Sequence, residues 1–170
     1  KIDEQSFQPG EVRPPHPSEV AIATALAGSF PNAARIGGTP AFFTELNRKR
    51  VPAGPLDFIT HATCPIVHAA DDLSVMQSLE AVPHIVRSAR AIYPHLAYRL
   101  GPVTIGMRQN PYGSRTMANP ERERIAMATL DPRQDGRFAA AWTLGYAAMT
   151  EAARLDTLTP SAVTGPLGLI

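Results

Sequence analysis

The residues from Phe58 to Asp72 bring several reactive side chains close together in the sequence. Within these positions lie two histidines, the only cysteine of the chain and two adjacent aspartates, namely His61, His68, Cys64, Asp71 and Asp72. An apolar run bounded by Pro55 leads into His61, as in a buried parallel strand. At the end of such a strand an imidazole could act as a general base near neutral pH. A histidine that only satisfies backbone groups there is the structural alternative.

The second half of this stretch allows two further kinds of chemistry. His68 with Asp71 and Asp72 could hold a divalent metal ion, because imidazole and carboxylate groups suit an ion with open coordination positions. No short ligand signature such as H-E-x-x-H occurs in the sequence, so we expect neither a metal nor another cofactor. The two aspartates equally suit the start of a helix. Cys64 could serve as a nucleophile, but its apolar surroundings are typical of a cysteine that only packs.

Glu45 is the candidate for a second acid–base group. It follows an expected strand and lies close to two phenylalanines, which would desolvate its carboxyl group and suit it to general-acid or general-base work. Pairing with Arg48, or capping of a turn, is the alternative role. Asn47, two residues further on, could bind a hydroxyl group of a substrate. We therefore predict Glu45 and His61 as the catalytic residues.

A third group of polar residues follows the apolar run at residues 103–105. Arg108 and Asn110 could bind an oxyanion or sugar hydroxyl groups, with Tyr112 as an apolar wall beside them. Turn formation alone would also explain Asn110, because Asn-Pro-Tyr-Gly is favourable turn chemistry. The residues that we predict to bind substrate are Arg108, Asn110, Tyr112, His68 and Asn47.

Four apolar runs in the chain are typical of strands, and helical patterns separate them. We expect strands at residues 34–39, 56–61, 103–106 and 157–163, the third starting as early as residue 98, and a further short one at 125–128. We expect helices at residues 18–30, 72–92 and 131–152, and residues 42–48 as a loop or final turn. Pro83 should kink or split the second helix. The buried stripe of the last helix would be Phe138, Trp142, Gly145, Met149 and Ala152.

This alternation predicts a parallel α/β architecture. Four strands are too few for a closed (β/α)8 barrel, which takes about 250 residues, so the chain is either half of a TIM barrel or a small open sheet. Because it begins at Lys1 and stops on an apolar segment, we expect a partial barrel. Residues 1–170 would form one α/β domain cut from a larger TIM-barrel catalytic domain, with an irregular lead-in at 1–16. Such a piece could self-associate.

In a parallel sheet the loops that follow the strands share one edge, so their polar residues would converge there. These residues are Glu45, His61, His68, Arg108, Asn110 and Thr164.

The composition excludes several classes of function. Lys and Arg number 16 against 15 Asp and Glu, and the net charge is +1, so we expect no nucleic-acid partner. No apolar segment reaches the roughly 18 residues that a membrane span needs, and no signal peptide opens the chain. A single cysteine cannot form an internal disulfide, which fits a reducing compartment, and we expect a cytoplasmic protein.

Five segments of the chain carry a specific pattern, at residues 35–39, 43–48, 58–72, 105–113 and 164–170. Together they resemble the D-apionate lactonase family, and the resemblance runs from about residue 30 to the end. It implies a TIM-barrel catalytic domain related to glycoside hydrolases. It also implies a hydrolase that opens the lactone of a branched five-carbon sugar acid in bacterial carbohydrate catabolism. The partner would then be a small sugar acid or lactone such as D-apionolactone.

Two other functions stay open on the residues alone. A glycoside-hydrolase-like enzyme could use Glu45 as one of two carboxylates, the second lying on a strand outside this sequence. A non-catalytic carbohydrate-binding barrel would present the same polar exit loops without turnover.

Overall fold

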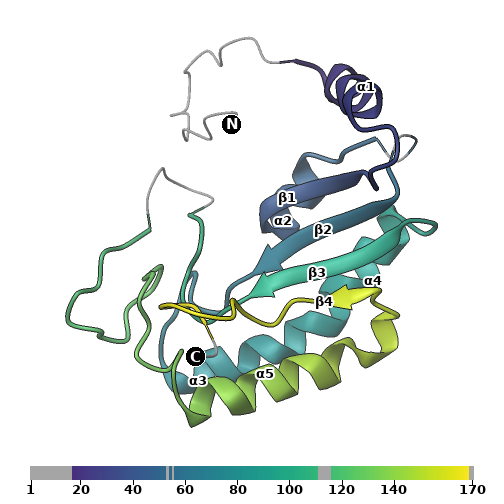
Figure 1. The fold of residues 1–170 in the computed structure, drawn as a ribbon. Coiled ribbons are helices and arrows are strands. Elements are labelled where there is room, and N and C mark those ends of the chain that lie inside the picture. The colour runs from purple at the N-terminus through teal and green to yellow at the C-terminus, as the bar shows by residue number, and fades with distance from the viewer. Residues whose placement is uncertain (1–16, 53, 55, 111–115, 169–170) are drawn as a thin grey trace.

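Four parallel strands form the sheet of the computed structural model, which describes residues 17–52, 54, 56–110 and 116–168. The strands are β1 (Ile36–Phe42), β2 (Phe58–Thr63), β3 (Ala97–Val103) and β4 (Thr157–Leu158). They lie side by side in that order, and each neighbouring pair is parallel (Figure 1). The predicted parallel α/β class is confirmed, and the sheet of the described residues is not closed. The predicted lead-in at residues 1–16 lies outside them.

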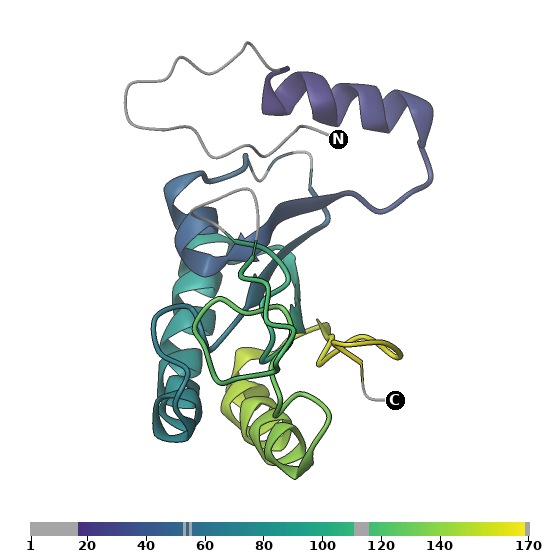
Figure 2. The same cartoon turned by 90° about the vertical axis from the view of Figure 1, so that its left-hand side faces the viewer.

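The helices that follow the strands cover one face of this sheet. They are α2 (Phe43–Arg48), α3 (Asp72–Gln77), the 3₁₀ helix η1 (Ser78–Ala81), α4 (Val82–Ile92), α5 (Arg137–Thr150) and the 3₁₀ helix η2 (Glu151–Ala153). Figure 2 shows them on one side of the sheet, whereas α1 (Glu19–Ser29) lies beyond the β1 edge. This is the layout of part of a (β/α)8 barrel. None of the described helices is long and apolar enough to cross a membrane.

The core lies between the sheet and these helices. From the strands, Ile59, Tyr98 and Leu100 are at most 1% exposed. They form one cluster with apolar side chains of the helical layer, among them Val75, Leu79, Val86 and Trp142. Each large apolar side chain buried in this way contributes about 1.5–3 kcal/mol, so this layer is the main source of stability.

The first strand lies slightly later in the sequence than predicted. It ends at Phe42, and the segment that we expected as a loop or final turn is the short helix α2. A register shift against β2 falls between Gly38 and Phe42. Pro40 lies inside this irregular stretch, where its missing N–H group costs no regular ladder bond.

The third strand begins close to the earliest predicted start, residue 98, but ends before the predicted residues 104–106. It runs from Ala97 to Val103. Beyond this end, the N–H groups of Ile105 and Gly106 are bound by the side chain of Gln134 and not by a neighbouring strand. The apolar pattern continues past the strand because Ile105 is itself buried, at 1% exposed.

The last strand is much shorter than the predicted range of 157–163. After its two residues, Thr159 still donates its N–H to the carbonyl of Leu100 at 2.9 Å and accepts from the N–H of Val103 at 3.0 Å. The next residue, Pro160, has no N–H group to extend the ladder. Strand pairing therefore stops there.

The long helix predicted over residues 72–92 is split around Pro83. α3, η1 and α4 follow one another, and Pro83 lies in the first turn of α4. A proline costs no intrahelical bond there, because the first N–H groups of a helix have no acceptor within it. The predicted split is confirmed.

The last helix begins later than predicted. Turns precede it, and α5 starts at Arg137. The carboxylate of Asp131 accepts a bond from the N–H of Arg133 at 2.9 Å, which holds the backbone in a turn before the helix. In the predicted buried stripe, Trp142 is 2% exposed as expected. Met149, however, is 41% exposed, and Thr150 is buried in its place at 4% exposed.

Candidate active site

The segments that follow the four strands lie along one edge of the sheet. They are α2 after β1, residues 64–71 after β2, residues 104–110 and 116–136 after β3, and residues 159–168 after β4. These segments occupy the left of Figure 1 and face the viewer in Figure 2. Barrel enzymes carry their sites at the carboxyl ends of parallel strands. This edge, called the carboxyl edge below, is therefore the candidate active site.

Glu45 lies in the first turn of α2, at the carboxyl end of β1, with its side chain 17% exposed. Its Oε2 accepts a hydrogen bond from the Thr44 hydroxyl at 2.8 Å, and its Oε1 lies 3.4 Å from Nη1 of Arg48. The pairing with Arg48 that we gave as the alternative role is thus present. Nearby, Oδ1 of Asn47 accepts a bond from Arg50 at 2.8 Å. The roles of Glu45 and Asn47 towards a substrate stay predictions.

His61 is fully buried, at 0% exposed, because β2 continues two residues beyond its predicted end. Its Nδ1 lies 2.9 Å from the carbonyl oxygen of Ala62 and its Nε2 lies 2.5 Å from the Tyr98 hydroxyl. A carbonyl only accepts, so Nδ1 carries the proton and Nε2 accepts from Tyr98. The ring also packs against Phe43, the first residue of α2, with centroids 5.8 Å apart.

Burial lowers the pKa of His61 to about 4, so its ring is neutral at pH 7. Both ring nitrogens are engaged with protein groups. The ring therefore lies where the alternative role of a satisfied core histidine would place it. Its work as a general base stays a prediction.

A groove of about 380 Å³ opens beside the carboxyl ends of β1 and β2. Its lining is mostly apolar and comes from the ends of β1 and β2, α2, the segment after β2, and the helices α3, η1, α4 and α5. Among the lining residues are Phe43, Thr63, Cys64, His68, Trp142 and Tyr146. The Thr63 hydroxyl donates to that of Tyr146 at 3.1 Å, and burial raises the pKa of Tyr146 to about 12. The volume falls within the range of about 300–1,000 Å³ typical of small-molecule sites. His68 is thus a predicted substrate-binding residue that lines a cavity.

The two aspartates after His68 have structural partners. Asp71 caps α3 by accepting a bond from Ser74 at 2.9 Å, and its bonds to Ser74 lower the pKa of its carboxyl group. Asp72 pairs with Arg133 at 3.0 Å and with a second arginine, Arg124, at 3.2 Å. Among the residues that the structure describes, no group of three or more His, Cys, Asp and Glu side chains is placed to hold a metal ion. The three residues of the metal hypothesis therefore do not form a ligand set.

Cys64 links two of the exit segments. Its thiol donates to the carbonyl oxygen of Ile105 at 3.4 Å. Burial raises the pKa of Cys64 to about 12, so the thiol stays protonated at pH 7. Because the thiolate is the reactive form, this geometry favours the packing role over the nucleophilic one.

The remaining predicted substrate-binding residues follow β3. Arg108 is exposed and Asn110 is partly buried. Tyr112 lies outside the described residues. In the segment after β4, Thr164 is exposed. The contacts of these side chains with a substrate stay predictions.

Sequence reasoning missed a set of buried polar residues within the segments that follow β3, namely Thr104, Asn119, Asp131, Arg133 and Gln134. Most of them belong to the segment between β3 and α5, where we expected a short strand at residues 125–128. In its described residues that segment instead holds an isolated bridge between Met117 and Ala128. The one signal in the sequence was the polar run Asp131–Gln134 before a helix, which we interpreted as a helix start.

Asp131 and Arg133 form the centre of this buried set. Nη2 and Nε of Arg133 bind the two carboxylate oxygens of Asp131 at 2.7 and 2.9 Å. The side chain of Arg133 is 4% exposed and that of Asp131 is 0% exposed. The hydrogen bonds to Asp131, more than those to Asp72, raise the pKa of Arg133. This bidentate pair holds the turn before α5. The remaining nitrogen of Arg133, Nη1, donates to Asp72 at 3.0 Å and so joins this segment to the start of α3.

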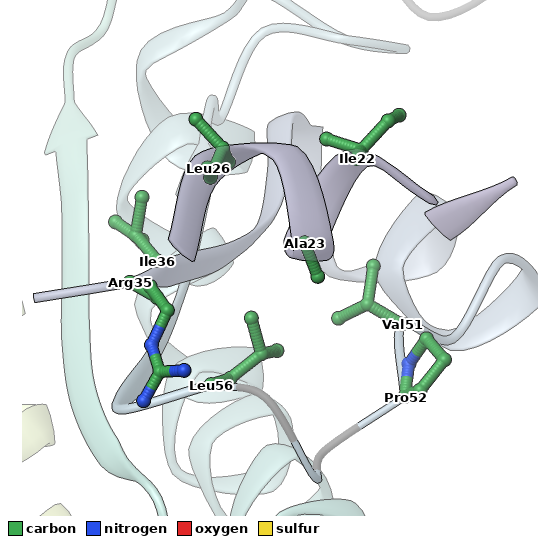
Figure 3. Close-up of a pocket in the computed structure, with 8 residues that line it drawn as sticks. All are labelled: Ile22, Ala23, Leu26, Arg35, Ile36, Val51, Pro52 and Leu56. Carbon is green, nitrogen blue, oxygen red and sulfur yellow. The ribbon is translucent and has the colours of Figure 1, made fainter. Parts of the chain in front are cut away.

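A second hollow lies at the opposite edge of the sheet, where β1 and β2 begin. It measures about 70 Å³ and lies between α1 and the residues that lead into these strands (Figure 3). Its lining is mostly apolar, and its charged residue, Arg35, is paired with Asp57 at 3.2 Å. It is far smaller than typical small-molecule sites. The carboxyl edge is the better candidate.

Comparison with known proteins gives a family match and a similar relative. The family profile described as D-apionate lactonase, TIM barrel domain, matches residues 1–170. The chain is also 58% identical over 168 residues to a protein of Brucella anthropi named D-apionate lactonase. That match covers 99% of this chain and 28% of the relative, so the chain spans little more than a quarter of its length. No solved structure matches the chain. The chain thus belongs to the D-apionate lactonase TIM-barrel domain family.

Proposed function

We propose that this chain supplies part of the active site of a hydrolase that opens the lactone of a branched sugar acid such as D-apionolactone. The observation that carries the proposal is the 58% identity to a protein named D-apionate lactonase over almost the whole chain. The groove and the polar exit segments at the carboxyl edge support it, because small-molecule sites of barrels lie there. The same similarity favours the lactonase over the glycosidase and the non-catalytic binding protein.

In the proposed reaction Glu45 acts as the general base. It takes a proton from water, whose oxygen attacks the carbonyl carbon of the lactone. The ring C–O bond then breaks, and the leaving ring oxygen takes up the proton that Glu45 removed from water, which yields the open hydroxy acid and returns Glu45 to its carboxylate form. Arg108 and Asn110 stabilise the negative charge that develops on the carbonyl oxygen.

His61 has a supporting part in this scheme. Its neutral ring packs under Phe43, two residues before Glu45, and is held by Tyr98. It would therefore orient the start of α2 and, through it, the carboxylate of Glu45. His68 and Asn47 would bind hydroxyl groups of the sugar. The setting would be bacterial carbohydrate catabolism in the cytoplasm.

The test is a chimeric enzyme in which this chain replaces the matching segment of the Brucella anthropi protein, which supplies the rest of that protein's length. We expect the chimera to hydrolyse D-apionolactone, measured as acid release in a pH-stat. The Glu45→Gln variant should lose roughly 10²- to 10⁴-fold in kcat, the usual contribution of general-base catalysis. Glu80→Gln, at an exposed position of η1, is the matched control and should keep its activity.

Two results would count against the proposal. A folded chimera without any lactone hydrolysis refutes the proposed function. Near-full activity of the Glu45→Gln variant leaves the function standing but removes Glu45 from the mechanism.

A further inference from the structure

The side-chain amide of Gln134 holds two backbone N–H groups at the carboxyl end of β3. Its Oε1 accepts from the N–H of Ile105 at 2.9 Å and from that of Gly106 at 3.1 Å. All three residues are buried. A buried N–H group without an acceptor is costly. The conformation of the Ile105–Gly106 peptide therefore depends on one oxygen atom of Gln134, which lies just before α5.

Neighbouring segments hold the same peptide from other sides. The carbonyl of Ile105 accepts the thiol of Cys64, from the segment after β2. The N–H of the next residue but one, Met107, donates to the carbonyl of Ala128 at 2.8 Å. Met107 is itself 0% exposed. The chain is thus fixed at each residue from Ile105 to Met107.

Gly106 is the point where these segments leave no room for a side chain. A Cβ atom there would collide with the carbonyl oxygen of Thr129 and would lie 2.6 Å from Cδ2 of Leu167. Leu167 belongs to the segment after β4. Segments that follow β2, β3 and β4 therefore meet around one peptide.

Gln134 is itself held in place by neighbouring residues. Its N–H donates to the carbonyl of Asp131 at 3.1 Å, and the carboxylate of Asp131 is bound by Arg133. Arg133 reaches α3 through Asp72. The oxygen that holds the β3 exit is therefore itself held by the buried ion pair and, through it, by the helical layer.

We propose that Gln134 is a positioning residue that sets the direction in which Arg108 and Asn110 leave the sheet towards the substrate. Arg108 follows Gly106 by two residues, and the one residue between them is buried. The chain has little freedom between the fixed peptide and the exposed guanidinium. The proposal rests on the proposed function, in which these two side chains bind the lactone.

Two substitutions separate this role from general packing. In Gln134→Leu the side chain is apolar and of similar size, so both N–H groups lose their acceptor. In Gln134→Glu the acceptor oxygen stays and can bind both groups. Gln77→Leu, at an exposed position of α3, is the matched control for the loss of an amide.

The activity test uses the chimera with the Brucella anthropi protein. We expect Gln134→Leu to lower kcat/KM by roughly 10- to 100-fold, the usual effect of a misplaced binding group, with Gln134→Glu restoring most of it. Combined with Arg108→Ala, Gln134→Leu should add less than about a twofold further loss, because the two changes remove the same interaction. The proposal is overturned if the activity losses of Gln134→Leu and Arg108→Ala multiply in the double variant. It is also overturned if Gln134→Leu folds and keeps its activity unchanged.

A second measurement does not depend on turnover. In the same chimera, Gln134→Leu should speed hydrogen exchange of the Ile105 and Gly106 amides and tryptic cleavage after Arg108, whereas Gln134→Glu and Gln77→Leu should not. If the unsubstituted chimera lacks lactonase activity, the proposed function fails, yet these rates still decide whether Gln134 holds the loop. Rates equal in Gln134→Leu and the unsubstituted chimera refute the positioning role.

Discussion

The two edges of the sheet are built in opposite ways. At the carboxyl edge, polar side chains are buried and bonded to one another, with Arg133 only 4% exposed between two aspartates. At the end of the sheet where the strands begin, called the amino edge, α1 exposes large apolar side chains, since Val20 is 63% and Leu26 45% exposed. Phe30, the residue directly after α1, is 62% exposed. The apolar residues of α1 lie all round the helix and not along one stripe. In Figure 3, Ala23 points from α1 towards Val51 and Leu56 across a small hollow.

The contrast teaches where the geometry of the candidate site comes from. The exit segments are fixed by bonds within the chain, many of them between residues far apart in the sequence. A helix that is apolar on all sides is typical of one covered by protein on several sides, and the described residues cover α1 only in part. The bonds described above that fix the exit segments involve no residue of α1.

The largest expected effect comes from breaking the buried pair. Arg133→Ala leaves the carboxylate of Asp131 buried without its partner and should lower the free energy of unfolding by about 3–5 kcal/mol. Urea unfolding of the chain measures this. The control is Arg122→Ala, which removes an exposed pair with Asp135 at 3.1 Å and should cost less than about 1 kcal/mol. Equal losses of unfolding free energy in the two variants would contradict the expected difference between a buried and an exposed ion pair.

Acid should weaken the structure through His61. In the folded chain its pKa is about 4, against 6.5 ordinarily, so the unfolded state binds the proton first as the pH falls. The contribution of His61 to the free energy of unfolding is therefore fully present above pH 6.5. It falls by roughly 3 kcal/mol as the pH drops to 4. Unfolding at several pH values should show a flatter curve for His61→Gln. The exposed His84→Gln should follow the unsubstituted chain, and a His61→Gln curve of unchanged slope would contradict the assignment.

The smallest expected effect lies on α1. Leu26→Ala removes a side chain that is 45% exposed and should change the free energy of unfolding by less than about 0.5 kcal/mol. Leu79→Ala, at a position only 9% exposed, is the matched change and should cost about 2–5 kcal/mol. Thermal or urea unfolding compares the two. A large loss in Leu26→Ala would mean that α1 is packed more firmly than its exposure indicates.

Local rules predicted much of this fold from the sequence. The alternation of apolar runs indicated parallel strands, and Pro83 indicated the split of the long helix, because both depend on neighbours along the chain. The ends of strands were less predictable. His61 was expected at a strand end, but β2 runs on to Thr63, so the ring lies inside the core against Tyr98.

The buried polar set could not be predicted, because its partners are distant in the sequence. Gln134 binds Ile105 across 29 positions, and Arg133 binds Asp72 across 61. A run of polar residues before a helix has a sufficient local explanation as a helix start. Only the folded chain shows that these residues hold the loop that follows β3.

The lone cysteine has a practical consequence for studying these loops. With its pKa near 12 instead of 9.0, Cys64 has a thiolate fraction roughly a thousandfold below that of an ordinary thiol at neutral pH. Maleimide dyes react with thiolates, so the native thiol should compete poorly with a cysteine introduced at an exposed position. A fluorophore can then be attached beside Arg108 or His68 without first removing Cys64. The wild-type packing between the exit segments stays intact in the labelled protein.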